Sequence, residues 1–97
     1  MKKFNEVIEK NISKLELYVP VVERVHGGTH PEFYEVRKEF DKINQKIKDN
    51  LVDGENLVEE FKQLREITDN YTVPSDTCES YEAVYVMLSE LDKAYNK

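Results

Sequence analysis

The sequence predicts an all-α protein: an antiparallel up-down-up-down four-helix bundle, formed by one domain over residues 1–97. Apolar residues recur every three or four positions in four segments, which is the period of a helix with one buried face. The chain has only three glycines and three prolines, and most of them lie between these segments. Short connections make neighbouring helices antiparallel.

The first expected helix covers residues 3–26. Its apolar stripe consists of Phe4, Ile8, Ile12, Leu15, Val19 and Val22. Pro20 interrupts the backbone hydrogen bonding, but the stripe continues past it, so we expect the helix to continue as well. His26 is the next position on the stripe. Gly27 and Gly28 then end the helix, and we expect one of them to adopt the left-handed conformation of a C-cap.

The second expected helix covers residues 30–51. Thr29 and Glu32 have the spacing of a capping box, and Pro31 suits a first helical turn. The apolar seam consists of Phe33, Val36, Phe40, Ile43, Ile47 and Leu51. Asp53 and Gly54 are expected to form the turn that follows.

The third and fourth expected helices cover residues 55–70 and 76–96. Asp76, with Glu79 three residues later, is predicted to cap the fourth helix. The inner stripe of the third helix consists of Leu57, Phe61, Leu64 and Thr68. The inner stripe of the fourth helix consists of Tyr81, Val84, Leu88, Leu91 and Tyr95.

Composition disfavours two classes of partner. The net charge is −6, and lysines and arginines are interspersed with acidic residues, whereas a nucleic-acid protein usually shows a basic stripe. No apolar run approaches the roughly 20 residues of a membrane span, and the N-terminal residues lack the apolar segment of a signal peptide. We therefore expect a cytoplasmic protein that binds neither nucleic acid nor membrane.

The only histidines, His26 and His30, flank the first predicted corner. A metal site in a helical bundle needs several inward-facing histidines and glutamates on facing helices. A site here would have to recruit Glu23 or Glu32 and would be exposed, so His26, His30 and Glu32 are weak metal candidates. We favour a structural interpretation, in which His26 completes the core stripe and His30 helps to cap the second helix.

Cys78 is the one cysteine of the chain, which excludes an internal disulfide and fits a reducing compartment. It lies near the start of the fourth helix, where the helix dipole favours a thiolate. Asp76 and Glu79 oppose this effect, and no histidine is close in sequence. We favour an unreactive, partly buried cysteine. The chain shows no phosphate loop, Ser-His-Asp arrangement or Cys-x-x-Cys motif, and we expect no catalytic residues.

Two stretches resemble a known family. Residues 22–27 (Val-Glu-Arg-Val-His-Gly) with 30–32 (His-Pro-Glu), and residues 64–74 running into Cys78 and 81–85, resemble the hemerythrin-like domain of the iron–sulfur cluster repair di-iron proteins. The stretches stand in the family's order and, with the helices between them, cover nearly the whole chain. The resemblance implies a four-helix bundle with an oxo-bridged di-iron site that supports repair of clusters damaged by oxidative or nitrosative stress.

The resemblance also implies where the iron ligands, four histidines and two glutamates, would stand. The first-helix ligand falls at Asn5, and the second-helix pair falls at about Asn50 and Gly54. The third-helix histidine also falls nearest Gly54, and the fourth-helix ligands would lie beyond Lys97. None of the six is present. His26 lies about 21 residues from Asn5, or roughly 30 Å along a helix, so it cannot replace them.

We therefore expect a non-catalytic, metal-free relative of this domain that acts as a binding or accessory protein. Its contact surface would involve His26, Tyr71 and Tyr85, or an apolar edge, and its partner would be another protein or a second copy of the chain. The alternative is a weak iron-binding protein that takes part in cluster repair, using His26, His30 and acidic residues or a site shared across a homodimer. A third hypothesis is a purely structural bundle that dimerises through exposed tyrosines.

Overall fold

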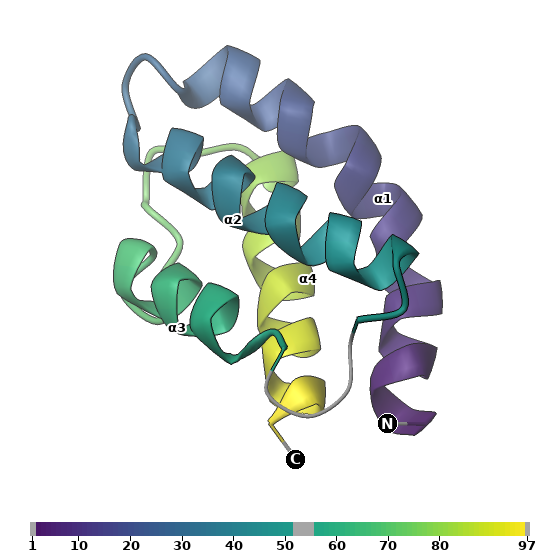
Figure 1. Cartoon of the computed structure of the whole chain (residues 1–97). Helices are drawn as coiled ribbons and strands as arrows, with labels where there is room; N and C mark the ends of the chain where they lie inside the picture. The colour runs from purple at the N-terminus through teal and green to yellow at the C-terminus, as the bar shows by residue number, and fades with distance from the viewer. Residues whose placement is uncertain (1, 52–55, 97) are drawn as a thin grey trace.

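The computed structural model describes residues 2–51 and 56–96, and every regular element within them is an α-helix. Four helices follow one another along the chain (Figure 1): α1 Lys2–His26, α2 Glu32–Lys48, α3 Val58–Ile67 and α4 Glu79–Tyr95. The all-α prediction is confirmed over these residues. The antiparallel order of a hemerythrin-like bundle stays a prediction.

Helix α1 spans the molecule. Its 25 residues correspond to about 37 Å at 1.5 Å per residue, and the longest extent of the protein is 35 Å. The helix continues through Pro20 without a break, as expected from its stripe. Ile8 and Ile12 pack at the edge of the core. The remaining stripe residues are fully buried: Phe4, Leu15, Val19 and Val22.

The corner between α1 and α2 is a tight turn over His26. Its carbonyl oxygen accepts hydrogen bonds from the backbone N–H groups of Thr29 and His30, at 3.1 and 2.8 Å. Neither Gly27 nor Gly28 has a positive φ, so the predicted left-handed C-cap is wrong. The capping box is wrong too, because the Thr29 hydroxyl donates to the His26 carbonyl at 3.2 Å and α2 begins without a side-chain cap.

Helix α2 ends at Lys48, earlier than predicted, because Asn50 adopts a φ of 58° that an α-helix cannot accommodate. Leu51 therefore leaves the seam and is 48% exposed. The rest of the seam is confirmed, with Ile47 at the edge of the core and four residues buried: Phe33, Val36, Phe40 and Ile43. The predicted turn at Asp53 and Gly54 lies outside the described residues.

Helix α3 is also shorter than predicted. Before its first turn, the backbone N–H of Leu57 donates to the hydroxyl of Tyr95 at 3.0 Å. After its last turn, Asp69, Asn70 and Tyr71 have φ values of 51°, 59° and 63°, and such left-handed residues end a right-handed helix. The predicted stripe is confirmed as buried: Leu57, Phe61, Leu64 and Thr68.

Helix α4 begins at Glu79, directly after Cys78, which has an extended conformation with φ −92° and ψ 173°. Asp76 does not cap it, which corrects the prediction, because its carboxylate contacts His30 instead. The inner stripe is confirmed as buried: Tyr81, Val84, Leu88, Leu91 and Tyr95.

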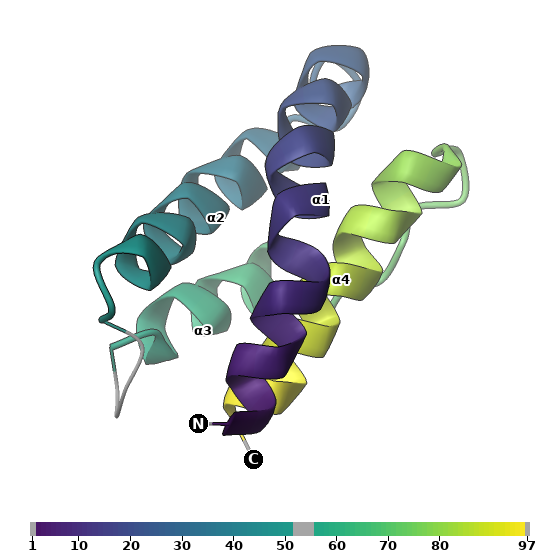
Figure 2. The ribbon, with the colours of Figure 1, turned by 90° about the vertical axis from the view of Figure 1, so that its right-hand side faces the viewer.

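Helix α1 packs against α4 and α2, and α3 packs against α2 (Figures 1 and 2). The beginning of α1 and the end of α4 lie at the same end of the molecule in both views. At that end the rings of Phe4, Phe61 and Tyr95 contact one another, with centroids 5.3–6.4 Å apart. These contacts connect α1, α3 and α4 through one aromatic group.

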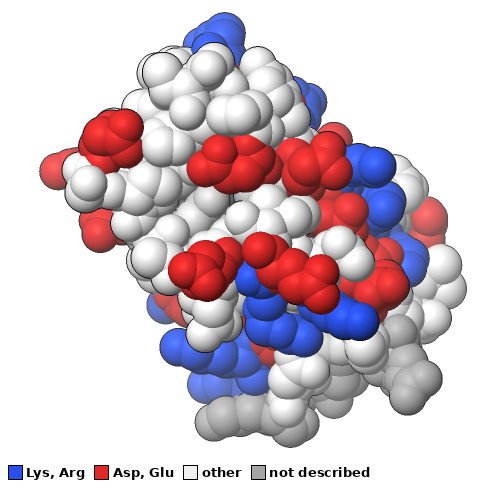
Figure 3. All heavy atoms as spheres, turned by 90° about the vertical axis from the view of Figure 1, so that its left-hand side faces the viewer, with Lys and Arg blue, Asp and Glu red and all other residues white. Residues whose placement is uncertain are grey.

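The described helices include none that is long and apolar enough to cross a membrane. Figure 3 shows one face, on which acidic and basic side chains lie next to one another in the lower and right-hand parts, while the upper left part is mostly uncharged with separate acidic groups. The Lys and Arg side chains drawn there do not form a continuous stripe. This face therefore has mixed charge.

Candidate functional site

Two stretches that are distant in sequence meet where α1 ends and α4 begins. The α1–α2 corner supplies His26 and His30, and the segment before α4 supplies Asp76 and Cys78. Tyr81, in the first turn of α4, contacts both histidine rings. We name these five residues the corner cluster. Both histidines singled out from the sequence belong to it.

His26 and Cys78 form an exposed contact in the corner cluster. Nε2 of His26 lies 3.1 Å from Sγ of Cys78, although 52 residues separate them. Cys78 is exposed, which corrects the expectation of a partly buried thiol. Sequence reasoning found no histidine near this cysteine, because only the folded chain brings the end of α1 to the start of α4.

His30 connects the α1–α2 corner to the segment before α4. Its Nδ1 lies 3.3 Å from Oε2 of Glu32, and its Nε2 lies 3.0 Å from Oδ1 of Asp76. The His30 side chain is only 14% exposed and its contact with Glu32 is partly buried, whereas the Asp76 side chain is 69% exposed and its contact with His30 faces water. His30 therefore positions the segment that carries Cys78, whereas the sequence suggested only a role at the start of α2.

Tyr81 is the buried centre of the corner cluster. The rings of His26 and His30 meet it edge-on, with centroids 5.4 and 5.6 Å away. Its hydroxyl lies 3.2 Å from the hydroxyl of Tyr85. Burial raises the pKa of both phenols, so both are uncharged at neutral pH. The histidines thus lie against a neutral aromatic surface.

The close approach of α2 to α1 depends on Gly27. A Cβ at this position would lie 2.5 Å from the carbonyl oxygen of Glu23 and 2.7 Å from Cζ of Tyr34. Glu23 also accepts a hydrogen bond from Nη1 of Arg37 at 2.6 Å, which ties the two helices together next to the corner. Gly27 therefore provides space for the turn that places both histidines.

The three metal candidates His26, His30 and Glu32 do not converge on one point. His30 contacts Glu32 through Nδ1, whereas its Nε2, on the opposite side of the ring, faces Asp76. Nε2 of His26 faces Cys78 instead. Across residues 2–51 and 56–96, no group of three or more His, Cys, Asp or Glu side chains is arranged to hold a metal ion.

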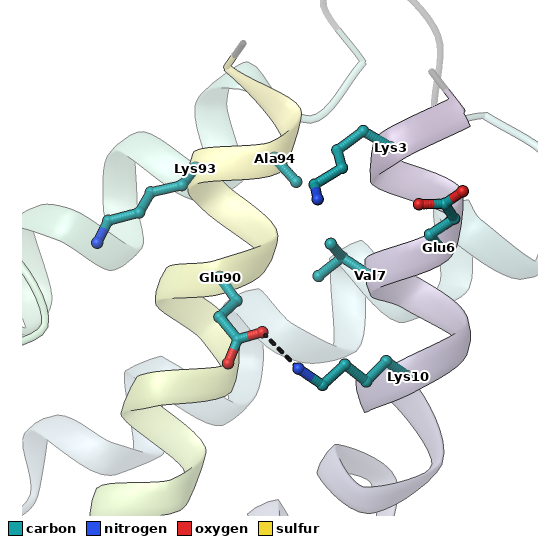
Figure 4. A pocket seen from close by; sticks show the side chains of 7 residues that line it. All are labelled: Lys3, Glu6, Val7, Lys10, Glu90, Lys93 and Ala94. Atoms are coloured by element: carbon teal, nitrogen blue, oxygen red, sulfur yellow. Dashed lines mark ion pairs between the residues drawn. The ribbon is translucent and has the colours of Figure 1, made fainter.

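The opposite end of the molecule is where the hemerythrin-like resemblance places the di-iron ligands. Asn5 and Asn50 are exposed, and Gly54 lies outside the described residues. A cavity of about 400 Å³ lies between the first turns of α1 and the last turns of α4 (Figure 4). Its lining consists of Lys3, Glu6, Val7, Lys10, Glu90, Lys93 and Ala94.

The donors around this cavity do not fit a di-iron centre. Figure 4 shows Lys3 and Val7 directed from α1 toward α4, and Lys10 paired with Glu90 at 3.6 Å. Lysine ammonium groups have no lone pair for iron, and one of the two carboxylates is already paired. A di-iron centre in a bundle needs several histidine and carboxylate donors, which this lining lacks.

The expected contact surface of His26, Tyr71 and Tyr85 is not one surface. Tyr85 is only 2% exposed, because its ring packs against Tyr81 in the core, so its assignment to a surface is corrected. Tyr71 is half-buried and donates its hydroxyl hydrogen to Oδ2 of Asp92 at 2.7 Å. Asp92 lies about 16 Å beyond Tyr81 along α4, which places Tyr71 far from His26.

Comparison of the chain with family models, with curated proteins and with solved structures gives no match. The relationship to the hemerythrin-like domain therefore stays an expectation from two stretches of sequence, which contact each other through His26 and Cys78.

Proposed function

We propose that this chain is a metal-free, non-catalytic binding or accessory protein of the cytoplasm. It is an antiparallel four-helix bundle related to the hemerythrin-like domain of the iron–sulfur cluster repair proteins. One observation carries the proposal: the two stretches that resemble that domain contact each other, through His26 with Cys78 and through His30 with Asp76. They form a shared surface at one end of the bundle.

The chemistry of the opposite end supports the metal-free part of the proposal. The cavity between α1 and α4 is lined by three lysines, where an iron centre needs histidines. The corner cluster lies at the other end of α1, because His26 is 16–23 residues after the lining residues Lys3 to Lys10, or about 24–35 Å at 1.5 Å per residue. His26 and His30 are therefore too distant to complete a centre in that cavity.

The corner offers an exposed surface to a protein partner. Val25 is 63% exposed and Tyr34 is 50% exposed. Val25 directly precedes His26, and Tyr34 lies against Gly27, so both border the corner cluster. Apolar and aromatic side chains supply the contact area of protein interfaces, and neighbouring polar groups orient the partner. We assign partner binding to the surface of Val25, His26 and Tyr34.

Metal analysis tests the first part of the proposal. The protein would be purified from an iron-replete culture, and the metal-free protein would then be titrated anaerobically with ferrous iron while absorbance is followed. We expect substoichiometric iron that a mild chelator removes. Stoichiometric, tightly held iron would contradict the proposal. Weak binding that His26→Gln and His30→Gln abolish would favour the alternative, an iron-binding protein in cluster repair.

A comparison of three immobilised proteins tests the contact surface. These are the unchanged chain, the double variant Val25→Ser/Tyr34→Ser, and the control Val86→Ser, which alters a residue on α4 that is 49% exposed. We expect the unchanged chain and Val86→Ser to retain the protein partner, and the double variant Val25→Ser/Tyr34→Ser to lose it. If all three proteins retain the partner equally, the surface of Val25, His26 and Tyr34 is not the binding surface. Sedimentation at high protein concentration tests whether the partner is a second copy of the chain. Sedimentation as a monomer would exclude a homodimer.

A further inference from the structure

The proposed binding function gives the Cys78–His26 pair no chemical role, yet the pair combines a nucleophile with a base. Nε2 of His26 is 3.1 Å from Sγ, and Cys78 is exposed. Cys78 directly precedes α4, a helix of 17 residues whose dipole favours negative charge at this end. Cys78 is also one of the residues that line a cavity of about 310 Å³, which gives a small reagent room next to this residue.

We propose that Cys78 is a thiol-exchange site, with His26 as its base, at which a small cationic disulfide forms a mixed disulfide with the protein. The proposal does not depend on the binding function. It rests on the contact between the two side chains, on the cavity that Cys78 helps to line, and on the charges around that cavity.

The reaction needs a thiolate, because the thiolate is the nucleophile in thiol–disulfide exchange. The proton on Sγ passes to Nε2 of His26 as the sulfur attacks one sulfur atom of the incoming disulfide. A new S–S bond forms to Cys78, the original S–S bond breaks, and its electron pair leaves on the second sulfur. That thiolate takes the proton from His26. The products are the mixed disulfide and one free thiol, and the imidazole is regenerated.

His26 is held in place for this role. It is the last residue of α1, and its ring lies against Tyr81 with a centroid distance of 5.4 Å and an interplanar angle of 86°. Tyr81 is packed in the core and fixes the orientation of the imidazole. Nε2 therefore faces the sulfur before any reagent arrives, so no side-chain ordering is needed at the moment of attack.

The charges around the cavity select the reagent. Two carboxylates, Glu79 and Glu82, line it. These carboxylates repel an anionic disulfide and attract a cationic one. Val73 and Pro74 form an apolar part of the lining that suits short alkyl arms. The structure therefore favours an aminothiol disulfide, with ammonium groups on short methylene chains.

The rate of mixed-disulfide formation tests the site. Cystamine would be added to the whole protein at pH 7 and low salt, and the adduct would be followed by mass spectrometry. We expect the folded chain to react at least about tenfold faster than the same chain unfolded in urea, since general-base assistance commonly contributes this much or more. Equal rates would overturn the proposal, and this comparison requires no variant.

Variants test the roles of the two residues. His26→Gln should react at least about tenfold more slowly than the unchanged chain, whereas Lys38→Gln, an exposed change on α2, should keep the original rate. Cys78→Ser should form no adduct. If His26→Gln remains folded by circular dichroism and reacts as fast as the unchanged chain, His26 only supports the structure and its role as base is overturned.

A second reagent tests the choice of a cation. The measured quantity is the rate with cystamine divided by the rate with the anionic dithiodipropionate. We expect this ratio to be about tenfold higher for the folded than for the unfolded chain. The ratio should shrink as added salt screens the carboxylates. Glu79→Gln/Glu82→Gln should lower this ratio, and His26→Gln should leave it unchanged. A ratio that is the same in the folded and unfolded chains would overturn the selectivity.

Discussion

The phenol end of Tyr34 lies over Gly27, so that a Cβ at Gly27 would be 2.7 Å from both Cζ and the hydroxyl oxygen of Tyr34. The same Cβ would be 2.5 Å from the carbonyl oxygen of Glu23. Carbon atoms do not approach backbone oxygens this closely without displacement. The corner that places His26 and His30 therefore closes only around a residue without a Cβ.

Gly27→Ala should lower the free energy of unfolding by about 1–3 kcal/mol, the usual effect of forcing an extra carbon into a filled site. Gly28→Ala is the matched control, because its Cβ meets nothing within 4 Å, and it should be neutral or stabilising by about 0.4–1 kcal/mol. Urea unfolding followed by circular dichroism measures both. Truncation of Tyr34 should restore only part of the loss, since the Glu23 carbonyl remains. Equal effects of the two alanines would contradict this account.

Asp92→Ala should lower the free energy of unfolding by about 2–4 kcal/mol, because Arg65, Tyr71 and Asn96 each lose a hydrogen-bond acceptor. Asp92 is 5% exposed and accepts hydrogen bonds from Nη1 of Arg65, at 2.7 and 2.9 Å, and from the hydroxyl of Tyr71 at 2.7 Å. The neighbouring exposed change Lys93→Ala should stay within about 0.5 kcal/mol of the unchanged chain. Thermal unfolding of the unchanged chain, Asp92→Ala and Lys93→Ala tests this prediction. Similar melting temperatures for all three proteins would refute it.

Tyr95→Phe should lower the free energy of unfolding by about 1–3 kcal/mol, because the backbone N–H of Leu57 loses its acceptor. The Tyr95 hydroxyl accepts from the backbone N–H of Leu57 at the start of α3, and this bond is buried. The phenylalanine ring would keep the contact with Phe4, so the change isolates the hydroxyl. Tyr34→Phe, on an exposed side chain, is the control. Amide hydrogen exchange should quicken at Leu57 in the first variant only, and unchanged exchange there would count against the prediction.

Stability should fall in alkali because of Tyr71, Tyr81 and Tyr85. Burial, the largest cause, raises the pKa of all three phenols above the value near 10 of an unfolded chain. The folded state thus holds these protons more tightly than the unfolded state. The stability that this provides is complete below about pH 10 and is lost as the pH rises through the folded pKa values.

Urea unfolding at several pH values between about 8 and about 11 should show this loss, and absorbance at 295 nm reports tyrosine ionisation. We expect Tyr71, Tyr81 and Tyr85 to ionise only together with the loss of helix. Ionisation of all six tyrosines while the helices remain intact would show that these phenols are accessible in the folded state.

The core could be predicted because helical burial follows from local periodicity. Val84 and Leu88, four residues apart, occupy one face of any helix that contains them, whatever lies against it. The helix boundaries could not be predicted as well. They depend on single backbone angles, such as the positive φ of Asn50 and of Asp69 to Tyr71, and non-glycine residues in this conformation carry only a weak sequence signal.

The corner cluster was predicted in part. Sequence spacing identifies His26 and His30 as candidates, but it assigns Asp76 to the cap of α4. Spacing along the chain indicates only hydrogen bonds between residues that are close in sequence. The fold instead offers Asp76 a partner in His30, 46 residues away. The same limit hid the contact of His26 with Cys78. An aromatic residue such as Tyr85 suits either a core or a surface, and only the fold shows which.

The beginning of α1 and the end of α4 lie together, at the end of the molecule remote from the corner cluster (Figure 2). A short peptide could therefore join the two ends and make the chain circular without crossing a folded face. Such a ring would suppress fraying at the start of α1 and leave His26 and Cys78 facing solvent. Attached to a solid support through that linker, every molecule would present its corner outward in the same orientation.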